Sequence, residues 1–420
     1  MDEGSNMHYK NKKDVEKIDK VNTFFKEVRV GDSWEEIECE YEIVNNCAIE
    51  KGGDYLAFVK EGAEIPDYVK TIGSRAFLNR EIKSITFPKS VEIIEELGCA
   101  DCDSLESVTL NEGLKKIGKM AFVRTKIKFL KIPKSVVEIE GGAFGDIELT
   151  VDPQNPKYEV RGNCLIEKET KKVINGMKNS VIPNDIKTIV AYAFAESSIE
   201  SITIPESVEV VEEGAFLCWK LKRVELNEGL REIGGSAFLG TKLDRITIPS
   251  TVELIGVGAF EEIKFSIEEG NKKYEVKENC IIEKETQKVV IAGKDSKIPD
   301  DAKHIGERAF SMSSIKRVNL PKEIESVGKF GLSYIDKINK VSLNEGLKEI
   351  GSWAFSGLKI KSVVIPNSVK VMGGYVFGCC DKLKKIYCRA KSKPDGWDEM
   401  WNSEGSKDVW FKVVWGYTGK

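Results

Sequence analysis

The phrase LREIGGSAF at residues 230–238 recurs along the chain, and this recurrence constrains the fold more than any other feature. Near copies are LKKIGKMAF at 114–122 and LKEIGSWAF at 347–355. The closing phenylalanine returns at steps of 22 or 23 residues, apart from two longer gaps, and Cys99 and Leu332 occupy two expected places. A period of about 20–29 residues is typical of a solenoid, in which each coil buries its apolar face against its neighbours. The repeated phenylalanines are Phe77, Phe122, Phe144, Phe194, Phe216, Phe238, Phe260, Phe310, Phe355 and Phe377.

A longer period groups these coils. The pentapeptide LNEGL occurs three times, and NCLIEKETKKVI (163–174) matches NCIIEKETQKVV (279–290) at nine of twelve positions. A weaker third copy is NCAIEKGGDYLAF (46–58). The sequence therefore predicts three super-repeats of about 117 residues, each a hairpin-like segment followed by four coils, which makes twelve coils in all.

Each coil is expected to begin with a short strand. Val224 and Leu226 alternate with polar residues, as in a strand with one buried face. Pro at the end of such a strand, or Gly229 in the LNEGL copies, marks the turn that follows. The remainder is too short for a helical crossover, so we predict an extended piece, one tight turn, and right-handed connections between parallel strands.

The phrase LREIGGSAF is then a structural part of the coil. We predict that Ile233 and Phe238 point inward, that Gly234 lets the backbone turn, and that Ala237 is small because the interior is crowded. Burial of each large apolar side chain contributes about 1.5–3 kcal/mol.

The hairpin-like segments carry EKET between two apolar runs, which suggests a two-stranded excursion from the solenoid. Two interpretations stay open. The hairpin either covers one side of the solenoid, which we favour, or forms a repeated contact element for a partner.

The two ends differ from the repeats. Apolar residues between 11 and 28 have helix-like spacing, which predicts a short amphipathic helix. The segment 393–417 contains four of the seven tryptophans, at positions 397, 401, 410 and 415. These large aromatic residues suit a cap over the last coil, and an aromatic ligand-binding cluster is the alternative.

Composition narrows the class of partner. The chain has a net charge of −4, with 41% hydrophobic and 31% charged residues, so any charge-driven partner must use a local patch. No apolar run is long enough to span a membrane, and the polar start shows no secretory signal. We therefore expect no membrane insertion and, if Met1 is the true start, a cytoplasmic location. Most of the ten cysteines are expected to be small buried apolar residues, because equivalent copies lie too far apart for disulfides.

At this point a family resemblance emerges. The segments SITIPESVEVVEEGAF, RITIPSTVELIGVGAF and SVVIPNSVKVMGGYVF resemble the BspA-like leucine-rich repeats of the Treponema pallidum type. The resemblance covers about residues 44–390 and implies a mostly β, α/β-type repeat solenoid: a right-handed leucine-rich-repeat coil with a parallel concave sheet. It also implies display on a bacterial surface, with adhesion or protein binding as the role. The expected organisation is an N-terminal segment with a short helix (1–43), a solenoid with inserted hairpins (44–390), and a Trp-rich cap (391–420).

Residues that carry catalysis are scarce. The two histidines, His8 and His304, lie far apart in sequence, which argues against histidine triads and zinc sites. The pair Cys99 and Cys102 has Cys-x-x-Cys spacing but lacks a second pair or a nearby histidine. No phosphate-binding loop motif occurs in the sequence. We therefore predict no enzymatic activity, cofactor or metal site.

The informative surface is the outward side of the strand that begins each coil. Two residues per strand face outward, and among the twenty such residues on ten coils six are basic and one is acidic, opposite in sign to the whole chain. This side predicts a concave ligand groove, rich in hydroxyl groups in its first third and cationic from Arg223 onward. The candidate ligand-binding residues are Phe129, Lys131, Arg223, Glu225, Arg245, Arg317, Lys340, Lys385 and Tyr387.

The predicted function is non-enzymatic binding of a protein or glycan by a monomer, with acidic ligands among the candidates. Nucleic acid is a weaker candidate, because few aromatic residues accompany the basic ones and the pI is about 5.7. The alternative function is an intracellular protein–protein interaction scaffold. A neutral explanation also stays open, in which Thr, Ser and Arg simply suit exposed strands.

Overall fold

A computed structural model describes residues 23–30, 33–405 and 409–419. These residues form strands joined by tight turns, and no helix occurs among them. Consequently, none of them belongs to a helix that could cross a membrane. The chain divides into two compact units. Unit 1 runs to Glu169 and includes Ile174–Met177, and unit 2 comprises Thr170–Val173 and Lys178–Lys420.

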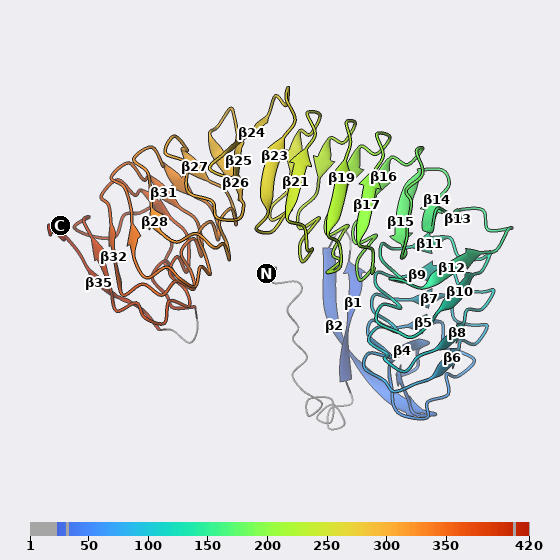
Figure 1. The fold of residues 1–420 in the computed structure, drawn as a ribbon. Coiled ribbons are helices and arrows are strands. Elements are labelled where there is room, and N and C mark those ends of the chain that lie inside the picture. The colour runs from blue at the N-terminus through green and yellow to red at the C-terminus, as the bar shows by residue number, and fades with distance from the viewer. Residues whose placement is uncertain (1–22, 31–32, 406–408, 420) are drawn as a thin grey trace. The chain divides into compact units, whose positions relative to one another are not determined.

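Each coil contributes a strand at its beginning, here called the lead strand. The lead strands pair in parallel in groups of two or three, as β17 does with β19 in register Ser201↔Arg223, and β21 with β23 in register Arg245↔Lys264. The lead strands β17, β19, β21 and β23 follow one another in the green-to-yellow part of Figure 1. The lead strands of unit 1 are β6 (Ser84–Thr86), β8 (Ser107–Thr109), β10 (Phe129–Ile132) and β12 (Glu148–Val151). Those of unit 2 are β17 (Ser201–Ile204), β19 (Arg223–Leu226), β21 (Arg245–Ile248), β23 (Lys264–Ile267), β28 (Val318–Asn319), β30 (Val341–Ser342), β32 (Ser362–Ile365) and β34 (Lys385–Cys388), followed by β35 (Lys412–Val414).

A second ladder runs through two-residue strands, here called return strands, which carry the Ile of the phrase LREIGGSAF. The described part of the chain has twelve of them in three sets of four, each set parallel. The first set is β5 (Thr71–Ile72), β7 (Ile93–Ile94), β9 (Lys116–Ile117) and β11 (Glu138–Ile139). The second is β16 (Thr188–Ile189), β18 (Val210–Val211), β20 (Glu232–Ile233) and β22 (Leu254–Ile255). The third is β27 (His304–Ile305), β29 (Ser326–Val327), β31 (Glu349–Ile350) and β33 (Val371–Met372).

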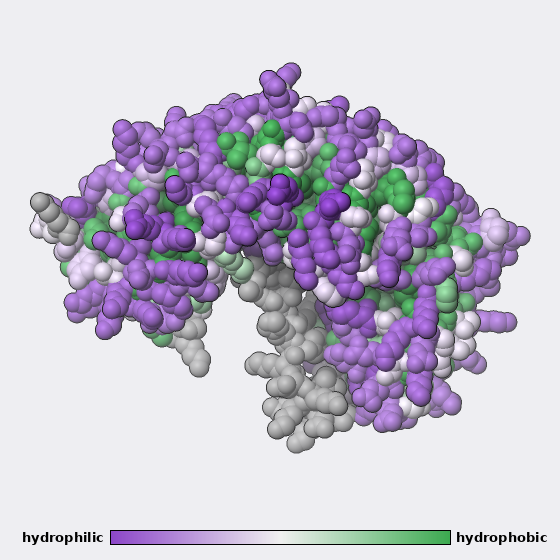
Figure 2. Space-filling view, viewed as in Figure 1, coloured by the Kyte–Doolittle hydropathy of each residue, from purple (hydrophilic) through white to green (hydrophobic). Residues whose placement is uncertain are grey.

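The interior is built from the repeated apolar residues, as predicted. Ile233, Ala237 and Phe238 are fully buried. The rings of Phe194, Phe216, Phe238 and Phe260 stack in a column, with successive centroids 4.7, 5.0 and 5.2 Å apart. Hydrophilic residues cover most of the face seen in Figure 2. The predicted mostly β solenoid is therefore confirmed.

The glycine of the phrase has a different role from the predicted one. Gly234 does not adopt a positive φ; the turn is made two residues later by Ser236, at φ 53°. A Cβ on Gly234 would instead lie 2.5 Å from the backbone nitrogen of Glu213 in the preceding coil. Glycine is required there because two coils approach closely. At Gly229, by contrast, a φ of 117° confirms the predicted special conformation.

The hairpin segments are not excursions from the solenoid. In unit 2, β24 (Tyr274–Lys277), β25 (Cys280–Glu283) and β26 (Lys288–Ala292) form an antiparallel meander, and β26 then pairs in parallel with the return strand β27. Each meander therefore starts a return-strand sheet. The corresponding strands earlier in the chain are β3 (Cys47–Glu50) and β4 (Tyr55–Val59), and β13 (Tyr158–Arg161), β14 (Cys164–Glu167) and β15 (Lys172–Gly176).

The expected N-terminal helix is wrong where the structure describes it. Thr23–Val30 form strand β1, which pairs antiparallel with β2 (Ser33–Val44); residues 11–22 lie outside the described residues. The segment TFFKEVRV is rich in aromatic and β-branched residues, which favour extended backbone. Pairing with a neighbouring strand satisfies this preference better than a helix would.

The tryptophan-rich segment packs onto the last coil. Trp397 and Trp401 are buried, their ring centroids lie 4.8 Å apart, and Trp415 lies 5.9 Å from Trp397. The indole nitrogen of Trp397 donates a hydrogen bond to the carbonyl of Val369. Trp410 is left exposed. This packing favours the cap over the aromatic ligand-binding cluster.

Candidate functional site

The lead strands present two columns of outward side chains, because alternate residues of a strand point to opposite faces. In β21, Arg245 and Thr247 are exposed, whereas Ile246 and Ile248 are buried. Parallel pairing in register places equivalent residues of adjacent coils side by side. We call the first of these columns in unit 2 the basic row. It comprises Arg223, Arg245, Lys264, Arg317, Lys340, Lys385 and Lys412, together with Ser201 and Ser362.

The predicted site residues divide between the two units. Phe129 and Lys131 lie on β10 in unit 1, where Phe129 is 68% exposed. The other predicted residues lie in unit 2, and all of them are exposed except Tyr387, which is half-buried. The members in unit 2 are Arg223, Glu225, Arg245, Arg317, Lys340, Lys385 and Tyr387.

Two basic residues of the row were missed by the sequence reasoning. Lys264 pairs with Arg245 in register, and Lys412 pairs with Lys385. Neither strand is followed by the apolar-Pro or LNEGL sequence that follows most lead strands, and neither was recognised. The alternation in IKFSI, from 263 to 267, is the signal that could have found Lys264.

Six of the seven basic side chains of the row make no ion pair within the described part of the chain. Arg245 is the exception: its guanidinium lies 3.6 Å from the carboxylate of Asp244, and both side chains are well exposed. Glu225, the acidic residue of the neighbouring column, accepts a hydrogen bond from the hydroxyl of Thr203 at 3.1 Å. The positive charge of the row is therefore largely available to a ligand.

The predicted residue in unit 1 has a different environment. The ammonium of Lys131 lies 2.7 Å from the carboxylate of Asp152. This hydrogen bond raises the pKa of Lys131 and lowers the pKa of Asp152. The ion pair neutralises Lys131, the one basic residue that was predicted on the ligand-binding face of unit 1.

Three lysines of unit 2 outside the basic row bind a glutamate of an adjacent coil. Lys187 binds Glu209 at 2.7 Å, Lys222 binds Glu200 at 2.9 Å, and Lys348 binds Glu325 at 2.8 Å. Each bridge joins two adjacent coils, and its hydrogen bond lowers the pKa of the glutamate. We call these the coil-edge lysines.

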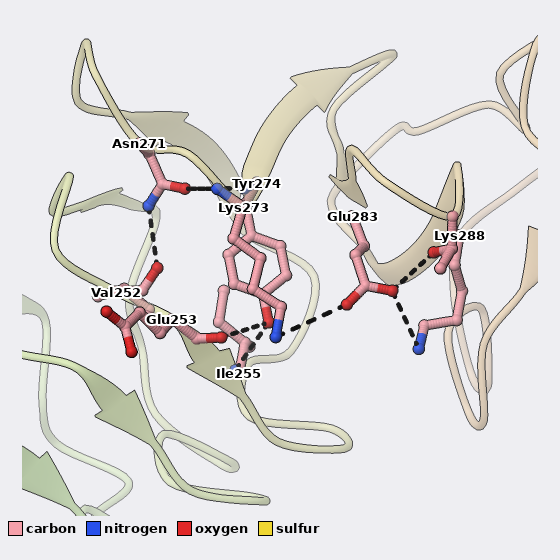
Figure 3. A network of polar contacts seen from close by, with 9 residues as sticks. Val252, Glu253, Ile255, Asn271, Lys273, Tyr274, Glu283 and Lys288 are labelled. Carbon is pink, nitrogen blue, oxygen red and sulfur yellow. Dashed lines mark hydrogen bonds and ion pairs between the residues drawn. The ribbon is translucent and has the colours of Figure 1, made fainter.

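The repeated hairpin segment uses its polar residues internally. The side chain of Asn271 donates hydrogen bonds to the carbonyls of Pro249 and Val252 and accepts from the amides of Lys273 and Tyr274. Figure 3 shows Asn271 with Val252, Lys273 and Tyr274. Asn271 is only 3% exposed, so these bonds anchor the meander to the preceding coil.

The rest of this network completes the anchor. The hydroxyl of Tyr274 accepts from the amide of Ile255 at 3.2 Å and donates to the carbonyl of Glu253 at 3.4 Å (Figure 3). Glu283 lies 3.8 Å from the ammonium of Lys273 and 3.5 Å from that of Lys288. Because these groups bond one another, the network favours a structural role of the hairpin, as the start of a return-strand sheet, over the contact element.

The residues considered for catalysis or metal binding include one described histidine and the Cys-x-x-Cys pair. His304 bonds the hydroxyl of Ser326 through its Nδ1, at 2.8 Å, and His8 lies outside the described residues. Among the described residues, no group of three or more His, Cys, Asp or Glu side chains could hold a metal ion.

The Cys-x-x-Cys pair is also buried. The thiol of Cys102 donates to the carbonyl of Phe77 at 2.9 Å, and burial raises its pKa to about 11. Burial likewise raises the pKa of Cys99 well above its usual value. These thiols are therefore protonated at neutral pH, which suits the predicted role of small apolar residues.

Comparisons with known proteins were made against families, curated proteins and solved structures. The family model of the BspA type leucine rich repeat region matches in six copies, over residues 60–150, 166–266 and 290–393. A search of curated proteins gave no match.

The search of solved structures gave several matches. The pneumococcal vaccine antigen PcpA is 17% identical, with 88% of each chain covered and a TM-score of 0.39. A leucine rich cell surface protein from Faecalibacterium prausnitzii A2-165 is 18% identical, with 94% of this chain and 95% of that chain covered and a TM-score of 0.40. A leucine-rich repeat protein from Bacteroides ovatus ATCC 8483 is 17% identical, with coverage of 94% and 98% and a TM-score of 0.32.

Proposed function

Because the chain belongs to the BspA-type leucine-rich-repeat family, we propose that it is a non-enzymatic binding protein whose lead strands recognise a protein or glycan ligand. The proposal includes action at a bacterial surface, as the resemblance to this family implies. It also includes a monomer as the binding species and the division into residues 1–43, 44–390 and 391–420.

One observation carries the proposal. The basic row of unit 2 holds seven basic side chains, and six of them make no ion pair within the described residues, whereas the coil-edge lysines Lys187, Lys222 and Lys348 each bind a glutamate. Exposed like charges on neighbouring strands repel one another. A ligand with negative charge would relieve this repulsion, and complementary charge also speeds association.

A pair of matched variants tests the proposal. The face variant combines Arg223→Gln, Arg245→Gln and Arg317→Gln, and the edge variant combines Lys187→Gln, Lys222→Gln and Lys348→Gln. Both remove three exposed positive charges from unit 2, and the edge variant also removes three ion pairs between adjacent coils. Circular dichroism and thermal unfolding establish that both variants are folded.

Ligand recovery is then measured with a glycan array and by affinity mass spectrometry of proteins. We expect the face variant to recover the ligands of the wild-type protein at a level about tenfold or more lower, and the edge variant to recover them at the wild-type level. Equal recovery by the wild-type protein and the face variant would contradict the proposed binding face.

A further inference from the structure

The column beside the basic row is rich in neutral hydrogen-bonding groups. In unit 2 it contains Thr247, Ser266, Asn319 and Ser342, all exposed. The hydroxyls of Thr247 and Ser266 lie 2.7 Å apart and bond each other across two strands. A ligand on this face therefore meets a row of cations with hydroxyl and amide groups alongside it.

This face offers few apolar anchors. The apolar residues of the neighbouring column in unit 2 that the structure describes are Val364, Tyr387 and Val414, and all three are half-buried. Protein interfaces depend on a few large apolar or aromatic side chains that become buried in the complex. Phe129 of unit 1, at 68% exposure, is such a side chain, but it does not belong to unit 2. The composition of the face therefore favours a hydrophilic ligand.

The spacing of the charges favours an extended ligand. Arg223, Arg245 and Lys264 lie on β19, β21 and β23, the lead strands of three successive coils. Of these, β21 and β23 are paired, and paired strands are about 4.8 Å apart, so the charges of Arg245 and Lys264 follow one another along a line that crosses the strands. Lys385 and Lys412 continue the pattern on the paired strands β34 and β35. A compact ligand would meet only one or two of these charges.

We propose that the ligand of the basic row is a linear anionic polysaccharide that carries carboxylate or sulfate groups and lies across the lead strands of unit 2. This inference rests on the proposed function and names its ligand class. The guanidinium groups of Arg223 and Arg245 can bind such groups with two parallel hydrogen bonds. Thr247 and Ser266 then bond the sugar hydroxyls. Single-stranded nucleic acid fits less well, because its bases require exposed aromatic side chains for stacking.

Titration with defined polymers tests the ligand class. Polygalacturonate carries the carboxylate groups, dextran sulfate carries the sulfate groups, and uncharged dextran is the control. Poly-L-glutamate and poly(dT) represent an acidic protein and a nucleic acid. We expect full-length protein to bind polygalacturonate or dextran sulfate, with an affinity that falls as salt is added, and to bind dextran at least tenfold more weakly.

The variants separate recognition of a sugar from attraction to any polyanion. The face variant should bind the charged polysaccharide about tenfold more weakly, and the edge variant should bind within about twofold of the wild-type protein. The double variant Thr247→Ala with Ser266→Ala should weaken polysaccharide binding and leave any residual poly-L-glutamate binding unchanged, because only the sugar uses these hydroxyls.

Contrary outcomes are distinguishable. If poly-L-glutamate or poly(dT) binds as tightly as both charged polysaccharides, or if neither polysaccharide binds, the inference is overturned. In that case the proposed function still holds if the face variant loses a protein ligand that the edge variant keeps. If the face and edge variants behave alike towards every ligand, the inference and the proposed function both fail.

Discussion

The lead strands of the two units have the same architecture and different exposed residues. In unit 1 the first column reads Ser84, Ser107, Phe129 and Glu148, without a basic residue, and in unit 2 the same column is the basic row. The inward residues hardly change, since Leu130 and Ile132 are buried on β10 just as Ile246 and Ile248 are on β21. The comparison shows that the buried positions specify the coil, whereas the outward positions are free to specify a ligand.

The hydrogen bonds that anchor a meander to the preceding coil through one buried asparagine, here called a joint, are also the same in both units. In unit 1 the side chain of Asn155 donates to the carbonyls of Pro133 and Val136 and accepts from the amides of Lys157 and Tyr158. Asn271 makes the equivalent four bonds in unit 2. If the scaffold is the shared part, equivalent changes to it must have similar effects in both units.

The largest expected effect comes from the buried phenylalanines. We expect Phe216→Ala and Phe122→Ala each to cost about 3–5 kcal/mol, through lost apolar contacts and the cavity left behind. The cost should be larger for Phe216, by about 1 kcal/mol, because its ring stacks on both Phe194 and Phe238, whereas the ring contact of Phe122 is with Phe144.

Hydrogen exchange measured by mass spectrometry assigns the loss to one unit, which a single melting temperature cannot do for a repeat protein. Urea unfolding followed by circular dichroism gives the total loss of free energy of unfolding. If either substitution left the free energy of unfolding nearly unchanged, the claim that the two units have the same kind of core would be wrong.

A smaller effect is expected at the joints. Asn155→Ala and Asn271→Ala should each lower the free energy of unfolding by about 2–3 kcal/mol, because buried backbone groups lose their partners. Equal losses, measured by urea unfolding, would sharpen the comparison. The substitution Asn367→Ala is the control, since this asparagine is exposed and should change stability by less than about 0.5 kcal/mol.

The smallest effect on stability is expected when basic residues like those of unit 2 are introduced into unit 1. Ser84 and Ser107 pair in register and are exposed, with Thr86 and Thr109 beside them. Arg at both serine positions should change stability by less than about 0.5 kcal/mol, because both sites are open to solvent.

The same transfer sharpens the ligand comparison. In the background of the face variant, Ser84→Arg with Ser107→Arg should restore part of the binding to an anionic ligand, by about threefold. Fluorescence anisotropy with a labelled oligomer of polygalacturonate measures the gain in affinity. No gain would show that the exposed columns alone do not specify the ligand.

The core was predictable because its signal repeats in every coil. Phe238 and Ile233 recur at a fixed spacing, and a residue that must be apolar in so many copies is buried in each of them. The role of Gly234 was not predictable in the same way. Gly234 is required because the backbone of Glu213 in the neighbouring coil lies close to it. The residue spacing within one coil does not predict this contact between coils.

The candidate site was predictable in position and less so in electrostatics. The alternation of β21 placed Arg245 outward correctly. The pairing of Lys131 with Asp152 was missed, because the two residues belong to different coils and meet only through the stacking. The joint could have been found by comparison of DPQNPKYEV with EEGNKKYEV, where an asparagine stands three residues before the tyrosine in both.

The joint asparagine has a consequence for how such a chain changes in length. On its upstream side Asn155 binds two carbonyls after a lead strand, and on its downstream side it binds two amides of a meander. Because Asn271 binds the same groups, a crossover between the two codons preserves both sets of bonds. Recombination there deletes or duplicates one whole cassette of a meander and four coils, and leaves a joint of native chemistry. The length of the exposed face can therefore be altered by gene rearrangement without a redesign of the core.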